Sequence, residues 1–187
     1  PSDICVDAQG RMLIVDDGRD LVWRIEPSGR AEVIAGGGVG DGGTAMSALL
    51  TNPFDVASDG LGNLWIVDTS NQRVRKVDAS GQITTVAGTG GYGFSEGNGQ
   101  ATEAMFANPL GIAVNGAGHL YIADTFNQRV RKMDPFGGIT TVAGTGIRGF
   151  SGDGGPATDA ALGNPSGVFV DGAGSIWIAD QDNHRIR

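Results

Sequence analysis

Cysteine and histidine are scarce in this chain of 187 residues, and their scarcity excludes several kinds of site. Cys5 is the only cysteine, so the chain can form neither an internal disulfide nor a thiolate metal cluster. The two histidines, His119 and His184, replace Asn63 and Ser175 and Gln72 and Gln128, respectively, in sister copies of the repeat described below. This argues against a histidine-based zinc centre and against a serine nucleophile with a histidine base.

Basic residues and long apolar runs are also scarce. Thirteen Lys and Arg face 21 Asp and Glu, which gives a formal net charge of −8. An acidic protein does not attract phosphate backbones through its overall field, so we expect no nucleic-acid partner. The basic pattern RVRK, at 73–76 and 129–132, lies in an expected strand rather than in an exposed loop. No apolar run approaches the roughly 18 residues needed to span a bilayer, so we expect no membrane insertion.

Glycine, in contrast, is abundant, at 33 of 187 residues, and it punctuates an internal repeat. The dipeptide Asn-Pro recurs at intervals of 56 residues, at 52–53, 108–109 and 164–165. "LWIVDTSNQRVRKVD" at 64–78 matches "LYIADTFNQRVRKMD" at 120–134, and a diverged copy precedes both at 12–26. We therefore divide the chain into repeats 1–52, 53–108 and 109–164 and a partial repeat 165–187.

Each full repeat contains four short runs typical of β-strands, which in the third repeat lie at 110–115, 119–124, 129–134 and 138–144. The short connections between them join antiparallel neighbours, so each repeat predicts a four-stranded meander. The second run, for example "LYIA", is apolar on both faces, and both faces must therefore be covered. Radial packing of successive meanders achieves this, so we predict an all-β chain folded as a β-propeller, with about three and three-quarter blades.

The pattern P-x-G-[VI]-x-V-x-x-x-G-x-[LI]-[WY]-I-[AV]-D-x-x-N-[QH]-R-[VI]-R resembles the NHL repeat. The long form, with "TVAGTG" and "GFSGDGGPAT", is similar to the NHL arrays of bacterial secreted or surface proteins and of teneurins. The resemblance covers the whole chain and implies a ring of about six blades and an extracellular, cell-surface or periplasmic location. We therefore expect a part of a larger propeller. A four-bladed ring and completion by a second chain are the alternatives, and open blade edges would support self-association.

The connections between repeats are expected on the same rim as the Asp-Thr-x-Asn turns, because strand direction alternates within each meander. The long loops 37–51, 89–107 and 145–163 also hold most of the variation between copies, and loops on a rigid scaffold usually carry binding. We predict a non-catalytic module, without a cofactor, that binds a protein or glycan partner through Asp41, Tyr92, Phe94, Glu96, Arg148, Phe150 and Asp153. The alternative is a propeller enzyme of the lyase or lactonase type whose catalytic residues lie outside this chain.

The turn after the second strand is the most strongly repeated polar element, and we interpret it as a structural lock. A carboxylate at the strand end can accept backbone N–H groups of the turn, and the arginine five residues later is expected to pair with a carboxylate. The lock residues are Asp68, Asn71, Arg73, Asp124, Asn127, Arg129, Asp180, Asn183 and Arg185. The first repeat departs from the pattern, with Arg19, Leu21 and Trp23 in place of Asn71, Arg73 and Arg75.

The stretch "GFSGDGGPAT" at 149–158 is close to a permutation of the nucleophile loop of trypsin-like proteases. Ser151 recurs as Ser95, but Asp153 matches Gly97, so we interpret the stretch as loop architecture. A structural Ca²⁺ bound by Asp41 or Asp153 and loop carbonyls remains open. The segments that follow the loops predict one helical turn in each crossover, and they place Leu50, Phe106 and Leu162 between adjacent blades.

Overall fold

The computed structural model describes residues 1–38, 43–95 and 99–187. Within these ranges the chain forms strands β1 (Asp3–Val6), β2 (Met12–Asp16), β3 (Leu21–Ile25), β4 (Ala31–Gly36), β5 (Pro53–Ser58), β6 (Leu64–Asp68), β7 (Arg73–Val77), β8 (Ile83–Ala87), β9 (Pro109–Val114), β10 (Leu120–Asp124), β11 (Arg129–Met133), β12 (Ile139–Ala143), β13 (Pro165–Val170), β14 (Ile176–Asp180) and β15 (Arg185–Ile186). Single 3₁₀ turns are η1 (Ala45–Ser47), η2 (Thr69–Asn71), η3 (Ala101–Glu103), η4 (Thr125–Asn127), η5 (Ala157–Asp159) and η6 (Gln181–Asn183).

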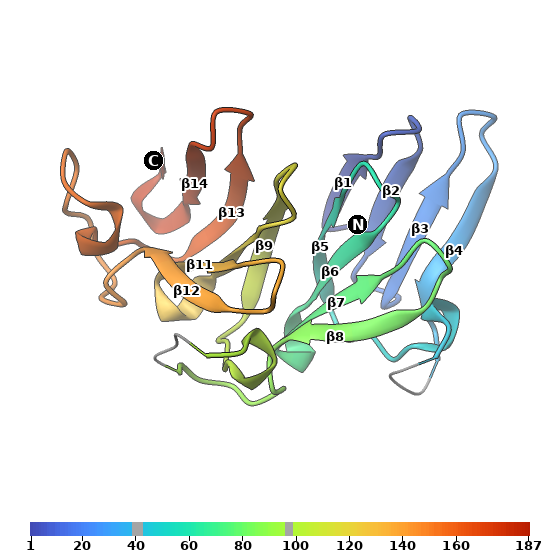
Figure 1. The fold of residues 1–187 in the computed structure, drawn as a ribbon, viewed down its shortest axis with the longest axis horizontal. Helices are drawn as coiled ribbons and strands as arrows, with labels where there is room; N and C mark the ends of the chain where they lie inside the picture. The colour runs from blue at the N-terminus through green and yellow to red at the C-terminus, as the bar shows by residue number, and fades with distance from the viewer. Residues whose placement is uncertain (39–42, 96–98) are drawn as a thin grey trace.

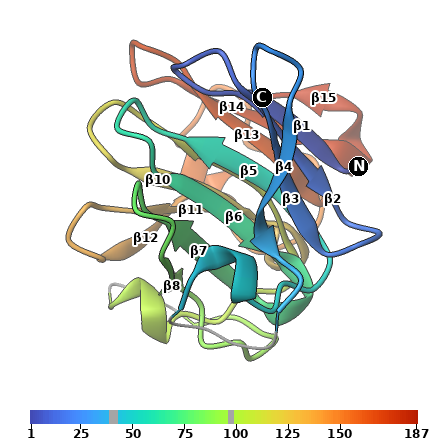
Figure 2. The ribbon, with the colours of Figure 1, turned by 90° about the vertical axis from the view of Figure 1, so that its right-hand side faces the viewer.

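The strands form four antiparallel sheets, each with its strands in chain order. We call them blade 1 (β1–β4), blade 2 (β5–β8), blade 3 (β9–β12) and blade 4 (β13–β15). The blades follow one another in an arc from the blue end to the red end of the chain, and their first strands lie side by side in chain order (Figures 1 and 2). The predicted all-β propeller, with three complete blades and three strands of a fourth, is confirmed.

The second strand of each central blade is buried on both faces, as its apolar sequence requires. All five residues of β6 and of β10 are buried. In β6, Leu64 and Ile66 pack in the core between blades 1 and 2, whereas Trp65 and Val67 pack in the core between blades 2 and 3. This arrangement follows from the twofold side-chain period of a strand.

The crossovers between blades also contribute to the core. The expected helical turns are present as η1, η3 and η5. Leu50, Phe106 and Leu162 follow these turns and are at most 1% exposed, which confirms that they fill the space between adjacent blades.

A side-chain joint links each blade to the next. Gln72 lies in the left-handed region at the end of η2, and its amide oxygen accepts the backbone N–H of Asn108 (2.8 Å). The Gln72 amide nitrogen donates to Oδ1 of Asn108 (3.2 Å). In blade 1, Asp20 takes the place of the glutamine and accepts the N–H of Asn52 (2.6 Å). Each Asn-Pro dipeptide thus enters its blade while held by the preceding blade.

The two outer blades expose large apolar side chains, among them Val6 and Met12 in blade 1 and Phe169, Trp177 and Ile186 in blade 4. Self-association through these blades stays a prediction. Among the described residues, no helix has the length and apolar character needed to cross a membrane.

Candidate functional site

The long-loop rim comprises the described residues of the crossovers between blades together with the turns η2, η4 and η6. In blades 2, 3 and 4 the rim is built on a carboxylate at the end of the second strand. Asp68 is fully buried, and its Oδ1 accepts the backbone N–H of Thr51 (2.8 Å) and the side-chain amide of Asn71 (3.0 Å). Asp124 and Asp180 bind Asn127 and Asn183 in the same way and accept backbone N–H groups of Ala107 and Gly163. The repeated carboxylate therefore ties each turn to the crossover that enters the same blade.

The arginines that pair with these carboxylates lie two residues beyond the predicted ones. Nη1 of Arg75 is 3.1 Å from Asp68, and the corresponding distances are 3.8 Å for Arg131 to Asp124 and 3.4 Å for Arg187 to Asp180. Arg73 and Arg129 instead donate to the carbonyl oxygens of Thr89 and Thr145, and Arg185 donates to that of Asn183. The expectation of a carboxylate partner for Arg73, Arg129 and Arg185 is therefore corrected. In each pair of arginines, the first (for example Arg73) reaches a backbone carbonyl, whereas the second (for example Arg75) is more buried and pairs with the carboxylate.

Burial of these arginine–carboxylate pairs raises the pKa of the carboxyl groups. Removal of Asp124 from water raises its pKa to about 6, although the N–H of Ala107, the amide of Asn127 and the Arg131 charge oppose the shift. Burial likewise raises the pKa of Asp68. The same burial lowers the pKa of Arg131, whose Nε and Nη2 have no hydrogen-bond partner in the described part of the chain.

Three of the predicted rim residues, although Phe150 and Asp153 stay partly exposed, contact arginines of the repeated turns. The guanidinium of Arg129 lies 3.9 Å from the ring centre of Phe94, and that of Arg185 lies 4.1 Å from the ring of Phe150. Asp153 forms an ion pair with Arg187 (2.5 Å). The predicted residues Asp41 and Glu96 lie outside the described residues.

The two remaining candidates, Tyr92 and Arg148, occupy equivalent places in successive crossovers. Tyr92 forms a parallel bridge with Phe106, as Arg148 does with Leu162. Nη2 of Arg148 lies 2.7 Å from Asp182 of the next blade, so this side chain is paired within the fold. Tyr92 is 63% exposed.

Sequence reasoning missed Phe126, which takes the place of Asp182 one repeat earlier. Its N–H donates to the carbonyl of Ala107, as the N–H of Asp182 donates to that of Gly163. The Phe126 side chain is 50% exposed. Because the backbones match, Tyr92 and Phe126 place two exposed rings where the next repeat has an ion pair. A phenylalanine at a turn position that holds Ser70 and Asp182 in the sister repeats was the available signal.

The two serines of the glycine-rich loops make different contacts, one through its hydroxyl and the other through its backbone carbonyl. Oγ of Ser95 accepts the N–H of Met105 (3.0 Å), and the carbonyl of Ser151 accepts a hydrogen bond from Arg187 (2.8 Å). Within the described ranges, no three His, Cys, Asp or Glu side chains gather in a metal-binding arrangement. The Ca²⁺ hypothesis stays untested, and Asp153 of that hypothesis is bound to Arg187.

A second concave region, the axial groove, lies along the first strands of the four blades and has a volume of about 380 Å³. Asp3 accepts the N–H of Val56 (3.2 Å), and Asp55 accepts the N–H of Ile112 (2.7 Å). Burial and the neighbouring Asp3 raise the pKa of Asp55 to about 8. Burial also raises the pKa of the nearby Cys5 to about 12, which makes this thiol a poor nucleophile at neutral pH.

Gly111 stands where Asp3 and Asp55 stand in the first two blades. A Cβ atom at Gly111 would lie 2.6 Å from the carbonyl oxygen of Ser166 and 3.1 Å from the backbone nitrogen of Val168. The backbones of β9 and β13 therefore approach each other directly. Asp3 joins β1 to β5 and Asp55 joins β5 to β9, but the interface between β9 and β13 has no room for a carboxylate at the equivalent position.

Comparison with known proteins agrees with the repeat register and the blade geometry. The family model described as NHL repeat matches residues 106–133. The chain is 34% identical over 134 residues to NHL repeat-containing protein 2 of Gallus gallus, covering 66% of this chain and 18% of that protein. It is 29% identical over 216 residues to teneurin-4 of Homo sapiens, covering all of this chain and 8% of that protein. The chain belongs to the NHL-repeat family.

The fold of this NHL-repeat chain is also found among solved structures. A protein of unknown function from Bacteroides thetaiotaomicron superposes with a TM-score of 0.79 at 24% identity, over 98% of this chain and 45% of that chain. At this identity the likeness shows the fold alone. The chain spans less than half of that structure and less than a fifth of the two NHL-repeat relatives.

Proposed function

We propose that this NHL-repeat chain is a non-catalytic binding module whose long-loop rim contacts a protein or glycan partner. The observation that carries the proposal is the exposure of Tyr92 and Phe126 at places that hold the Arg148–Asp182 ion pair in the next repeat. A paired Arg and Asp satisfy each other at the surface. Two exposed rings gain their full burial only when a second molecule covers them.

Neighbouring features of the same rim support this proposal. Ile147, on the crossover that carries Arg148, is 70% exposed. Aromatic side chains are enriched in protein interfaces and offer a flat face for stacking. The arginines of the basic strands, which would have to contact a nucleic acid, are instead bound to Asp68, Asp180 and rim carbonyls. The absence of a nucleic-acid partner and the extracellular or cell-surface location remain parts of the proposal.

The test compares a rim variant with an equally apolar surface variant elsewhere. Wild-type protein, Tyr92→Ser/Phe126→Ser and Phe136→Ser are labelled and applied to a glycan array and to an array of purified surface and secreted proteins. Phe136 is 92% exposed on the turn between β11 and β12, away from the long-loop rim. We expect ligands of the wild type to be lost from the double variant and kept by Phe136→Ser.

Two outcomes would overturn the proposal: no ligand distinguishes the wild type from the double variant, or Phe136→Ser loses the same ligands. Circular dichroism and the thermal midpoint of each variant show whether the fold is intact. We expect an intact fold, because both altered rim side chains are exposed. The enzyme alternative places its catalytic residues outside this chain and stays a prediction.

A further inference from the structure

Leu13 in β2 stands at a position that carries an aromatic residue in all three of the other repeats. Trp65, Tyr121 and Trp177 occupy it in blades 2, 3 and 4. Trp65 and Tyr121 point toward the following blade and are 6% and 5% exposed. The buried ring at this position thus fills the interface between adjacent blades.

A cation accompanies each of the two buried rings, Trp65 and Tyr121. The residue that faces the ring across the strand pair is Lys76 for Trp65 and Lys132 for Tyr121. The ammonium nitrogens lie 5.5 and 5.8 Å from the ring centres, within the range of cation–π attraction. Blade 1 keeps the cation, since Arg24 is the cross-strand partner of Leu13, but it lacks the ring.

An open cleft of about 590 Å³ occupies this interface between blades 1 and 2. Its apolar walls include Leu13, Ile34, Leu64 and Val77. The last three correspond to Val86, Leu120 and Met133, which belong to the cluster around Trp65 between blades 2 and 3. The cleft therefore retains the surroundings of a buried ring.

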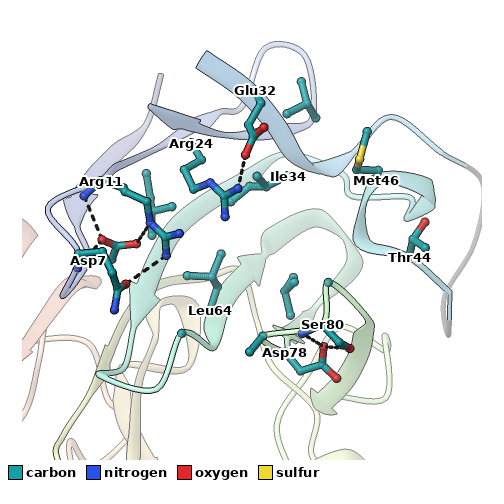
Figure 3. A pocket seen from close by; sticks show the side chains of 17 residues that line it. Asp7, Arg11, Arg24, Glu32, Ile34, Thr44, Met46, Leu64, Asp78 and Ser80 are labelled. Atoms are coloured by element: carbon teal, nitrogen blue, oxygen red, sulfur yellow. Dashed lines mark hydrogen bonds and ion pairs between the residues drawn. The ribbon is translucent and has the colours of Figure 1, made fainter. Parts of the chain in front are cut away.

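Charged side chains at the cleft are largely balanced within the protein. Figure 3 shows the guanidinium groups of Arg11 and Arg24 directed into the space above Leu64. Nε of Arg11 is 2.6 Å from Asp7, and Arg24 forms ion pairs with Glu26 and Glu32. This balance favours an uncharged ligand over a strong anion. The volume lies in the range of small-molecule sites, which is about 300–1,000 Å³.

We propose that the cleft between blades 1 and 2 binds a small, uncharged aromatic molecule of the indole or phenol class. The ring lies against Leu64, above the fully buried Leu13 and with Arg24 over its face, and so replaces the side chain that Trp65 supplies one repeat later. The site is separate from the rim contact proposed at Tyr92 and Phe126. Most of its walls are the turns between the first and second strands and between the third and fourth strands, and the rim contributes only Thr44 and Met46 of the first crossover.

The probe for the test is 5-fluoroindole, observed by fluorine NMR as the protein is titrated. We expect one saturable site in the wild type. Leu13→Trp places in blade 1 the side chain that blade 2 already accommodates, so we expect a folded protein with a raised thermal midpoint and at least about tenfold weaker binding. Arg24→Met is expected to weaken binding several-fold, whereas Arg24→Lys keeps most of it.

Other outcomes would overturn the proposal. One is unsaturable binding to the wild type, and another is equal binding to Leu13→Trp. Unfolding of Leu13→Trp would also contradict it, since the cleft would then lack the shape of the ring site in blade 2. Cyclohexylmethanol, an aliphatic ligand of similar size, should bind more weakly than the fluoroindole, and equal binding would remove the aromatic assignment. Tyr92→Ser should leave the titration unchanged and so separates this site from the proposed rim contact.

Discussion

Gln128 of blade 3 holds Asn164 at the entrance of blade 4 by two hydrogen bonds across 36 residues of sequence. Its amide oxygen accepts the backbone N–H of Asn164 (2.6 Å), and its amide nitrogen donates to Oδ1 of Asn164 (2.9 Å). Both residues have positive φ, 55° and 48°, so the joint is made by two strained backbone positions that fix each other. The same pair recurs as Gln72 and Asn108.

Gln128→Ala should lower the free energy of unfolding by about 1–3 kcal/mol, because it leaves the partly buried groups of Asn164 unpaired. Urea unfolding followed by tryptophan fluorescence measures the change. Gln181→Ala, at an exposed position of η6, is the control and should change stability by less than about 0.5 kcal/mol. If the joint contributed nothing to stability, the two variants would have the same free energy of unfolding.

Arg75→Ala should destabilise the protein far more than Arg73→Ala. Loss of Arg75 leaves the Asp68 carboxylate buried beside an empty space, which costs about 3–5 kcal/mol. Arg73 donates to an exposed carbonyl, so its loss should cost less than about 1 kcal/mol. Thermal melts of the two variants provide the comparison. The reverse order would mean that Arg73 rather than Arg75 stabilises the turn.

Protonation of Asp55 should make stability depend on pH. The pKa of this carboxyl is raised from its ordinary 3.8 to about 8, so the folded protein binds a proton that the unfolded chain has released. The stabilisation is complete below about pH 4 and is lost as the pH rises through about 8. We expect urea unfolding to show a loss of more than about 1 kcal/mol over this range.

Asp55→Asn should flatten that pH dependence, because the amide stays neutral and its oxygen can still accept the N–H of Ile112. Asp159→Asn, at an exposed position of η5, serves as the control and should keep the wild-type slope. Asp124, whose pKa of about 6 acts in the same direction, is common to all three proteins. An unchanged slope in Asp55→Asn would contradict the assignment.

Gly111→Ala should destabilise the contact between blades 3 and 4. The added Cβ would lie 2.6 Å from the carbonyl of Ser166, and backbone on both sides leaves little freedom to relax. We expect a loss of about 1–3 kcal/mol. Gly116→Ala is the matched control, because no atom lies within 4 Å of its added Cβ. Hydrogen exchange of β13 amides would locate the effect, and protection equal to that of Gly116→Ala would refute the close approach.

The repeat predicted the blades, the crossover turns and the buried positions of Leu50, Phe106 and Leu162, because each follows from strand period and copy number. The partner of Asp68 was not predictable in this way. Arg73 and Arg75 are two residues apart and share one face of β7, so periodicity cannot distinguish them. Asp68 even lies opposite Arg73 in the register, yet Arg75 is the deeper side chain and makes the ion pair.

The rim showed the same limit. Arg148 and Asp182 are 34 residues apart, and their contact depends on how closely two blades approach. Sequence comparison placed Arg148, Phe150 and Asp153 correctly in the crossover but could not show that each has a partner within the protein. Tyr92 and Phe126 occupy the places of Arg148 and Asp182 one repeat earlier, and with a phenylalanine in place of the aspartate no ion pair forms there.

The Gln–Asn joints link the blades in one direction along the chain. Each joint reaches from the turn of one blade to the first residues of the next, so a blade is anchored at its entrance by its predecessor and anchors its successor in turn. Blades 2 and 3 are held on both sides, whereas blades 1 and 4 are each held on one side within this chain. Opening of the structure should therefore progress like a zip, from an outer blade inward, and amide exchange should be slowest in β6 and β10.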